Sequence, residues 1–211
     1  MNTETIQESL KTKGYCIIPN ILSESETEKG IQEFKNWQQS IPDHDYIVNH
    51  LNFNGIYKYH RVGHTRHAWF IRTRPKVQQV FKELWKCDEL ITSFDGCCYI
   101  LKENNKKDTC WTHSDQAPNS KGVHCYQSFV SLTENKERTF VVYEGSHLLH
   151  EPYFEERNIK NDRNWQIIDP EYLTSIIETK KILHVPKGSM VIWDSRTFHQ
   201  NQFGNSNSEE R

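Results

Sequence analysis

The chain has 211 residues, with 26 lysines and arginines against 28 aspartates and glutamates, for a formal net charge of −2. Basic residues are dispersed among acidic ones, so charge gives no reason to expect a nucleic-acid partner. No apolar run approaches the ~18 residues that a membrane helix needs, and the polar start lacks the basic and apolar regions of a signal peptide. We therefore expect a soluble, cytoplasmic protein without a membrane partner.

Length and cysteine content narrow the class further. A chain of 211 residues is long enough for one hydrophobic core, so we expect a single domain covering 1–211. The six cysteines include no C-x-x-C pair, and the adjacent Cys97 and Cys98 make a poor start for a disulfide framework. Reduced thiols in an intracellular protein are the simpler interpretation.

Residues 1–90 carry the helical signals. Ser23 and Glu26 have the S-x-x-E form of a capping box, and apolar residues follow at helical spacing. Pro75 suits the first turn of a helix, and the apolar residues after it recur three and four positions apart. The sequence thus predicts helices over 5–13, 24–39 and 75–85, with a short strand within 14–19.

The segment 40–74 is polar, aromatic and rich in histidine. The spacing of its histidines matches no compact metal motif, so we expect solvated or hydrogen-bonded loop residues, with the lining of a substrate pocket as the alternative. The histidines concerned are His44, His50, His60, His64 and His67.

From residue 91 onward the pattern changes to short strands separated by polar turns. Helices followed by such strands indicate a mainly β protein of the α+β class, with flanking helices around a jelly-roll core, the double-stranded β-helix of cupin-like proteins. The charged, aromatic segment 148–180 interrupts this core as an insertion, and we expect it to form a lid or rim. The expected strands cover 91–94, 97–101, 109–113, 126–132, 140–143, 182–185 and 190–193.

The sequence His113-Ser114-Asp115, together with the distant His199, offers two imidazoles and one carboxylate. On a strand, residues i and i+2 point to the same side, so His113 and Asp115 could bind one ion together. The strand 190–193 runs toward His199, and we expect it to lie beside the strand that bears His113. Two histidines and one carboxylate on one face of an ion form the facial triad of ferrous oxygenases.

Simpler interpretations exist for each of these residues. Alone, His113 would be a hydrogen-bonded strand histidine and Asp115 a surface carboxylate; only their combination with His199 favours a metal site. A catalytic zinc hydrolase could use the same three ligands, but the H-E-x-x-H motif of the usual helical hydrolases is absent from the sequence. An oxygenase is therefore favoured, with a zinc-dependent hydrolase as the less favoured alternative.

The chain resembles the phytanoyl-CoA dioxygenase family of iron(II)- and 2-oxoglutarate-dependent oxygenases over nearly its whole length. Individually the shared motifs are weak, but they occur in the order found in the family. They are Gly14-Tyr15-Cys16-Ile17-Ile18-Pro19, Phe94-Asp95-Gly96, His113-Ser114-Asp115, Gly145-Ser146-His147, Pro186-Lys187-Gly188-Ser189 and His199-Gln200-Asn201.

The resemblance implies a cofactor, a co-substrate and residues that hold them. It implies that His113, Asp115 and His199 bind iron(II), that O₂ is consumed, and that an arginine some eleven or twelve residues beyond the distal histidine binds the far carboxylate of 2-oxoglutarate. Arg211 stands at that offset and Asn201 suits a smaller polar contact, while Arg196 is an alternative anchor on charge alone.

Tyr99 is a further candidate contact of 2-oxoglutarate, although an ordinary buried tyrosine with a hydrogen bond is the simpler and favoured interpretation. His147 is expected to be structural or pocket-lining.

The expected activity is hydroxylation of a small-molecule or acyl-type substrate, with release of succinate and CO₂. A carboxylate at Asp115 favours hydroxylation, because related halogenases carry a small residue there and so leave room for chloride. The alternative is a non-catalytic jelly-roll protein that binds metal or 2-oxoglutarate without turnover. The sequence indicates neither the substrate nor the oligomeric state; specificity is expected in the loops 40–74 and 148–180.

Overall fold

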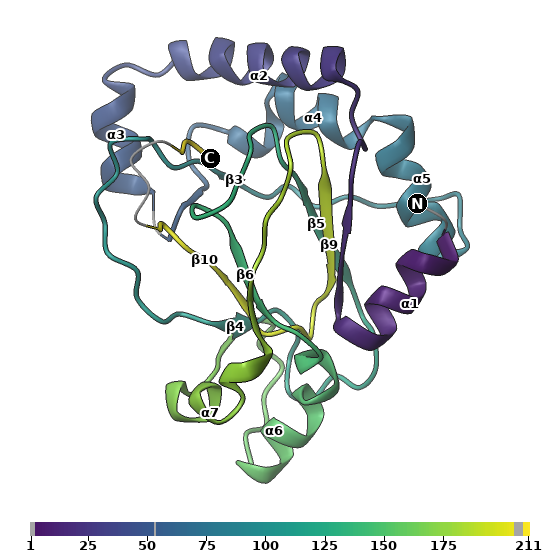
Figure 1. Cartoon of the computed structure of the whole chain (residues 1–211). Helices are drawn as coiled ribbons and strands as arrows, with labels where there is room; N and C mark the ends of the chain where they lie inside the picture. The colour runs from purple at the N-terminus through teal and green to yellow at the C-terminus, as the bar shows by residue number, and fades with distance from the viewer. Residues whose placement is uncertain (1–2, 53, 205–208) are drawn as a thin grey trace.

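Two antiparallel sheets face one another in the computed structural model, which describes residues 3–52, 54–204 and 209–211 (Figure 1). One sheet has the strand order β1-β9-β5 and the other β7-β4-β10-β6-β8, while β2 and β3 form a separate pair. The expected fold class, a mainly β core with flanking helices, is confirmed. The strands are β1 (Tyr15–Ile18), β2 (Ile56–Tyr57), β3 (Cys97–Cys98), β4 (His113–Ser114), β5 (Tyr126–Val130), β6 (Phe140–Tyr143), β7 (Gln166–Ile167), β8 (Lys180–Ile182), β9 (Met190–Asp194) and β10 (His199–Asn201).

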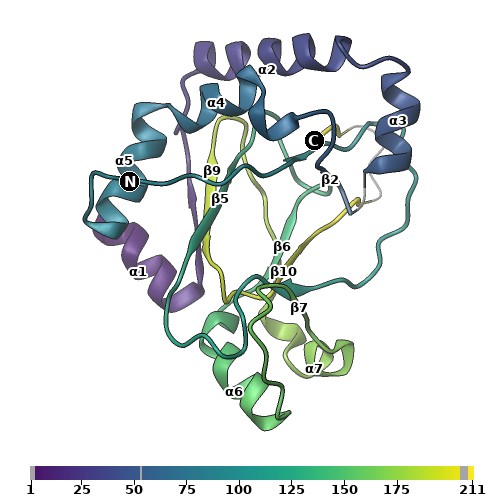
Figure 2. The ribbon, with the colours of Figure 1, turned by 180° about the vertical axis from the view of Figure 1, so that it is seen from behind.

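The helices gather on one sheet and at the two ends of the molecule, as the two opposite views show (Figures 1 and 2). None of the helices in the described part of the chain is long and apolar enough to cross a membrane. They are α1 (Thr3–Lys13), α2 (Glu24–Gln39), α3 (His44–Leu51), α4 (Arg66–Arg72), α5 (Pro75–Trp85), α6 (His150–Glu156) and α7 (Pro170–Ser175), with three short 3₁₀ turns at Val62–His64, Ser146–Leu148 and Ile177–Thr179.

The predicted capping box at the start of α2 is confirmed. The Ser23 hydroxyl accepts from the backbone N–H of Glu26 at 3.2 Å, and the Glu26 carboxylate accepts from the backbone N–H of Ser23 at 2.9 Å. These bonds satisfy two donors that a helix start otherwise leaves unpaired. Pro75 begins α5 as expected, where its missing N–H costs nothing.

The three-stranded sheet has two apolar faces because its residues alternate. On β1, Cys16 and Ile18 face outward and pack with Ile6 of α1, Val77 of α5 and Ile192 of β9. Helices α1 and α5 cover this outer face.

The opposite face of that sheet packs against the five-stranded sheet. Trp193 and Val191 of β9, Phe129 of β5, and Phe140 and Val142 of β6 meet there, and together they form the apolar part of the interior between the sheets. Position 193 pairs across strands with both Tyr15 and Gln127, which places these residues beside it in the sheet.

Several predicted strands are wrong or shifted. Residues 91–94 form no strand; Ile91 is fully exposed, and Phe94 instead stacks on His64 at 4.4 Å between ring centroids. Of 97–101 only Cys97 and Cys98 form a strand, and their partner β2 lies in the segment predicted as loop.

The other strand differences are smaller. In the predicted strand 109–113, residues 109–112 are irregular and the observed strand β4 begins at His113. In place of the predicted strand 182–185, β8 ends at Ile182 and Val185 forms an isolated bridge with Asn135.

The segment 148–180 has more regular structure than a loop. It contains α6, β7 and α7, and β7 joins the edge of the five-stranded sheet by pairing Ile167 with His113. The insertion thus lies directly beside the strand that carries a predicted metal ligand.

Candidate metal centre

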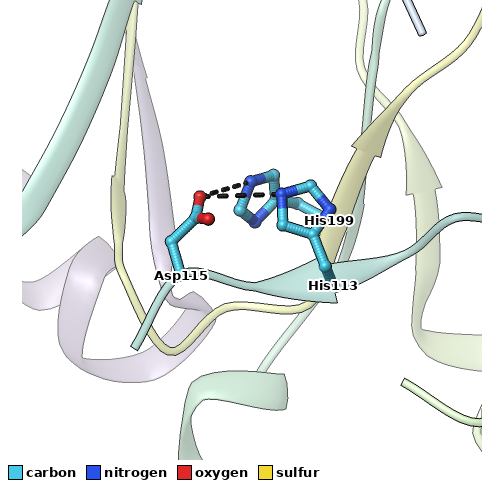
Figure 3. Close-up of side chains that lie close together, drawn as sticks. All are labelled: His113, Asp115 and His199. Atoms are coloured by element: carbon cyan, nitrogen blue, oxygen red, sulfur yellow. Dashed lines mark ion pairs between the residues drawn. The ribbon is translucent and has the colours of Figure 1, made fainter. Parts of the chain in front are cut away.

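The two histidines of the predicted triad lie opposite each other on paired strands. His113 on β4 and His199 on β10 are register partners, and their ring centroids are 4.4 Å apart. Figure 3 shows both rings turned toward the carboxylate of Asp115, which follows β4. The prediction that strand 190–193 lies beside the strand bearing His113 is wrong. That strand, β9, belongs to the three-stranded sheet, and a turn carries the chain across to β10 of the five-stranded sheet before His199.

Both imidazoles are oriented by backbone carbonyls two residues earlier in the chain. Nδ1 of His113 lies 3.2 Å from the carbonyl of Trp111, and Nδ1 of His199 lies 2.8 Å from the carbonyl of Thr197. A carbonyl oxygen only accepts, so each ring carries its proton on Nδ1. Each Nε2 therefore presents a lone pair toward Asp115, the tautomer that metal binding requires.

The carboxylate of Asp115 completes a cluster of three acceptor atoms. Its Oδ2 lies 3.3 Å from Nε2 of His199 and 3.6 Å from Nε2 of His113. Ligand atoms at ~2.1 Å from an octahedral ion are about 3 Å apart, so these separations are close to those of a metal site. No other group of three such ligands was found among the described residues.

The charge state of Asp115 supports a cation at this position. Burial raises the pKa of its carboxyl, but His113 and His199 more than offset this and hold the pKa well below its usual range. Burial lowers the pKa of His113, and the neighbouring His199 adds to this. The carboxyl is therefore ionised, and a cation bound between it and the two imidazoles would compensate its charge.

Gln127 is a neighbour of the triad that the sequence did not reveal. Its Nε2 donates to Oδ2 of Asp115 at 3.0 Å, from β5 in the opposite sheet. Its Oε1 is buried and accepts no hydrogen bond from the described residues. No local motif could have identified this contact, since glutamine on a strand is common and the partner is twelve positions away in another sheet.

Aromatic rings enclose the two histidines. The ring of His113 stacks on Trp111 at 4.9 Å, and Trp165 of the insertion lies 5.5 Å from it. The ring of His199 contacts Phe140 at 5.1 Å and Trp193 at 5.3 Å. These rings restrict water around the ligands and fix the orientation of both imidazoles.

Arg211 reaches the interior between the sheets from the last described segment. Its backbone exchanges two hydrogen bonds with Ile100, while its guanidinium lies 4.9 Å over the ring of Phe129 and donates to Oδ1 of Asn201 at 3.0 Å. Asn201 follows His199 by two positions on β10, so both side chains lie on the same face of that strand.

Among the described residues, the buried Arg211 guanidinium has no ion-pair partner. The residue is 8% exposed. Burial lowers its pKa, but an arginine remains charged under such conditions. A buried charge that no carboxylate compensates is costly, and an anionic ligand would remove that cost.

The alternative anchor Arg196 is already paired. Its guanidinium donates to both oxygens of Asp194, at 3.0 and 2.7 Å, and Glu151 lies 4.0 Å away. The hydrogen bonds that Arg196 donates to Asp194 raise the pKa of Arg196. Because Asp194 and Glu151 already compensate its charge, Arg196 is a weaker candidate than Arg211 for binding the far carboxylate of 2-oxoglutarate.

Tyr99 lies away from the triad contacts. Its hydroxyl accepts from Nε2 of Gln38 at 2.5 Å, and its ring packs on Phe34 at 4.8 Å. Both partners belong to α2. Nε2 of His147 lies 3.0 Å from the carbonyl of Lys11.

An open cleft of about 560 Å³ adjoins the triad on the side of Asp115. Its walls come from the segment after β2, from β5 and from the insertion, so three separate parts of the chain meet at the metal ligands. The lining residues are Lys58, Asp115, Gln127, Arg163, Asn164 and Trp165.

Known proteins resemble this chain in sequence and in fold. The family model described as phytanoyl-CoA dioxygenase (PhyH) matches residues 10–209. A relative called Ava biosynthesis cluster protein O, from Aspergillus versicolor, is 29% identical over 214 residues, which cover 90% of this chain and 70% of that protein.

Solved structures with low sequence identity share the fold. GlcNAc Inducible Gene 2 from Candida albicans superposes with a TM-score of 0.71 at 15% identity, covering 98% of this chain but only 61% of that one. HygX from Streptomyces hygroscopicus, solved with nickel and 2-oxoglutarate bound, superposes with a TM-score of 0.59 at 13% identity, covering 100% of this chain and 84% of that one. A second HygX structure also contains hygromycin B.

Proposed function

Because this chain belongs to the phytanoyl-CoA dioxygenase family, whose members are iron(II)- and 2-oxoglutarate-dependent oxygenases, we propose that it hydroxylates a small organic molecule bound in the cleft beside Asp115. The family membership makes it an enzyme of the 2-oxoglutarate-dependent class. The hydroxylation and the choice of substrate are the proposed part. HygX, which shares the fold, is an example of a protein of this shape with a small molecule bound.

The described residues divide into two sets with separate tasks. His113, Asp115 and His199 would hold iron(II) from one side and leave the side toward the cleft open. Arg211, with Asn201 beside it, would hold the far carboxylate of 2-oxoglutarate through parallel hydrogen bonds. When bound, these two groups supply the oxidising chemistry, in which O₂ is consumed and succinate and CO₂ are released.

The protein's own contribution is orientation and the exclusion of water. The backbone carbonyls fix the tautomer of both imidazoles, and Gln127 holds one oxygen of the Asp115 carboxylate. The indole N–H of Trp193 is buried and has no acceptor among the described residues, so it can donate to a bound oxyanion. No side chain needs to act as a general base.

One observation carries this proposal: three possible ligand atoms, from His113, Asp115 and His199, lie within 4.8 Å of one another. The same three ligands would also suit a catalytic zinc ion. Family membership favours iron over zinc, and the buried unpaired charge of Arg211 favours a dicarboxylate co-substrate over a simple hydrolytic water.

The test is 2-oxoglutarate turnover by the purified full chain. With iron(II), ascorbate and O₂ we expect succinate to form slowly without a substrate. The rate should increase when a suitable small molecule is added. His199→Ala should abolish both succinate formation and binding of nickel(II), measured by calorimetry. His184→Ala is a matched control, since His184 is exposed and pairs with Glu134 on the surface.

Two results would contradict the proposal. Absence of succinate together with absence of 2-oxoglutarate affinity in the metal-loaded protein would remove the oxygenase assignment. Activity of the zinc-loaded protein toward esters or amides, with none from the iron-loaded protein, would favour the hydrolase instead.

A further inference from the structure

We propose that the primary substrate carries an oxyanion group beside a flat ring, and that Arg163 and Trp165 bind these two parts. The inference rests on the proposed function, because the cleft concerned is the approach to the metal ligands. It goes beyond that function by naming the chemical class of the substrate and the segment that selects it.

The charge of the cleft is the first argument. Arg163 and Lys58 both line it, and neither forms an ion pair with the described residues. The only carboxylate in the lining is Asp115, and a bound metal would use that charge. Two cations on different walls therefore face a cleft that supplies no anion of its own, which favours a negatively charged ligand.

The backbone around Arg163 is fixed although its side chain is exposed. The N–H of Arg163 donates to Oδ1 of Asn161 at 3.0 Å, and its carbonyl accepts from Nε2 of Gln166 at 2.7 Å. The acidic neighbour Asp162 is engaged elsewhere, because its Oδ1 accepts from Asn119 at 2.8 Å. A guanidinium on a fixed backbone with no acidic partner is preorganised for an external oxyanion.

A second set of bonds ties this segment to the loop that follows the metal ligands. Oδ1 of Asn164 accepts from the N–H of Ala117 at 3.2 Å, and the carbonyl of Asn161 accepts from the N–H of Asn119 at 3.3 Å. Ala117 is two residues beyond Asp115. The position of Arg163 is therefore set relative to the metal ligand itself, as a specificity residue requires.

Trp165 supplies an aromatic surface at the same place. Its ring centroid lies 5.5 Å from that of His113, yet the residue is 46% exposed. A large ring that contacts a buried metal ligand and still leaves nearly half its surface to solvent has a free area for stacking. Trp165 is therefore suited to pack on a flat ring beside the oxyanion held by Arg163.

The test compares the affinities of matched acid and amide probes for protein loaded with nickel(II) and saturating 2-oxoglutarate. Binding of each probe is measured by ligand-detected NMR. Suitable probes are 2-naphthoate with 2-naphthamide, indole-3-acetate with indole-3-acetamide, and 2-naphthyl phosphate as a second oxyanion. We expect the acids to bind more tightly than the amides, and added salt to weaken the acids alone. Arg163→Gln should weaken acid binding roughly tenfold without affecting the amides.

Two further variants separate the parts of the proposal. Trp165→Leu should weaken acids and amides alike, since both carry the ring. Lys160→Gln removes one positive charge from the same exposed segment, outside the cleft lining, and should leave all probes unchanged.

The proposal is overturned if acids bind no better than amides in the parent protein, including the case in which neither is detected. It is also overturned if acid binding falls as 2-oxoglutarate is raised, because the acid would then occupy the co-substrate position. Failure of the proposed function is distinguishable, since it appears as absence of 2-oxoglutarate binding before any probe is added.

Discussion

The interior between the two sheets holds its two predicted binding groups by different means. At the metal ligands, His113 and His199 are direct register partners on paired strands, so the sheet backbone sets their separation. Arg211 lies outside the strands and is attached through its backbone to Ile100 and through the nearby Glu209 to the start of the β6 region. The geometry of the metal ligands thus depends on the sheet, whereas the position of the Arg211 guanidinium depends on the segment 209–211. Mutations should therefore change metal affinity and 2-oxoglutarate affinity independently.

The largest separation is expected from Arg211→Met. Loss of charge-assisted hydrogen bonds to a carboxylate should weaken 2-oxoglutarate binding by about a hundredfold. Metal affinity should stay within about twofold, because Arg211 contacts no metal ligand directly. Calorimetry on the nickel-loaded protein measures both quantities, and Arg211→Lys should fall between the two forms. If Arg211→Met lowered metal affinity as much as 2-oxoglutarate affinity, the metal ligands and Arg211 would not be independent.

The opposite pattern is expected from Gln127→Leu. Removal of the hydrogen bond to Asp115 leaves the ligand less well oriented, which should lower metal affinity by about tenfold. When the variant is saturated with metal, its affinity for 2-oxoglutarate should equal that of the parent protein. Ser128→Ala, next along the same strand and facing the other side of the sheet, is the control. A change in the absorption spectrum of the cobalt(II)-loaded protein would separate altered coordination from simple destabilisation.

The smallest effect is expected from Glu209→Gln, which loosens the segment bearing Arg211. The Glu209 carboxylate accepts from the backbone N–H groups of Lys136, Glu137 and Arg138 at 2.9–3.2 Å. A neutral amide accepts more weakly, so 2-oxoglutarate affinity should fall a few-fold while metal affinity is unchanged. Unchanged 2-oxoglutarate affinity would show that Ile100 alone positions Arg211.

The same carboxylate gives the segment a defined response to acid. Burial raises the pKa of Glu209, but the three backbone donors more than offset it, and the pKa lies below its ordinary 4.5. The stabilisation is therefore present above about pH 4.5 and is lost as pH falls through the lower pKa of the folded state. Thermal unfolding between pH 5 and 3 should show a smaller decrease for Glu209→Gln than for the parent protein.

The sequence allowed the fold class and the triad to be predicted, for local and pattern-based reasons. His113 and Asp115 are two residues apart, and the ordered motifs place His199 beside them. What could not be predicted depends on contacts between distant segments. The crossing from β9 to β10, the β2–β3 pair and the hydrogen bond from Gln127 all join residues whose local sequence carries no signal of the partner.

Arg211 and Trp165 mark two further limits of the sequence. Arg211 was found only through the spacing that a family resemblance implies, since a single arginine has no pattern of its own. For the segment 148–180 the sequence predicted a lid or rim, and the structure shows that Trp165 is both beside His113 and exposed.

The pairing of β7 with β4 attaches the strand of the insertion to the sheet along one side only. Strand β7 lies at the edge of its sheet, so it has a single neighbour, and that neighbour carries His113. Replacement of an edge strand requires only one ladder of hydrogen bonds to be remade, whereas replacement of an inner strand disturbs two. Substrate preference can therefore diversify through exchange of the segment 159–167 while the strands that hold the metal ligands are retained.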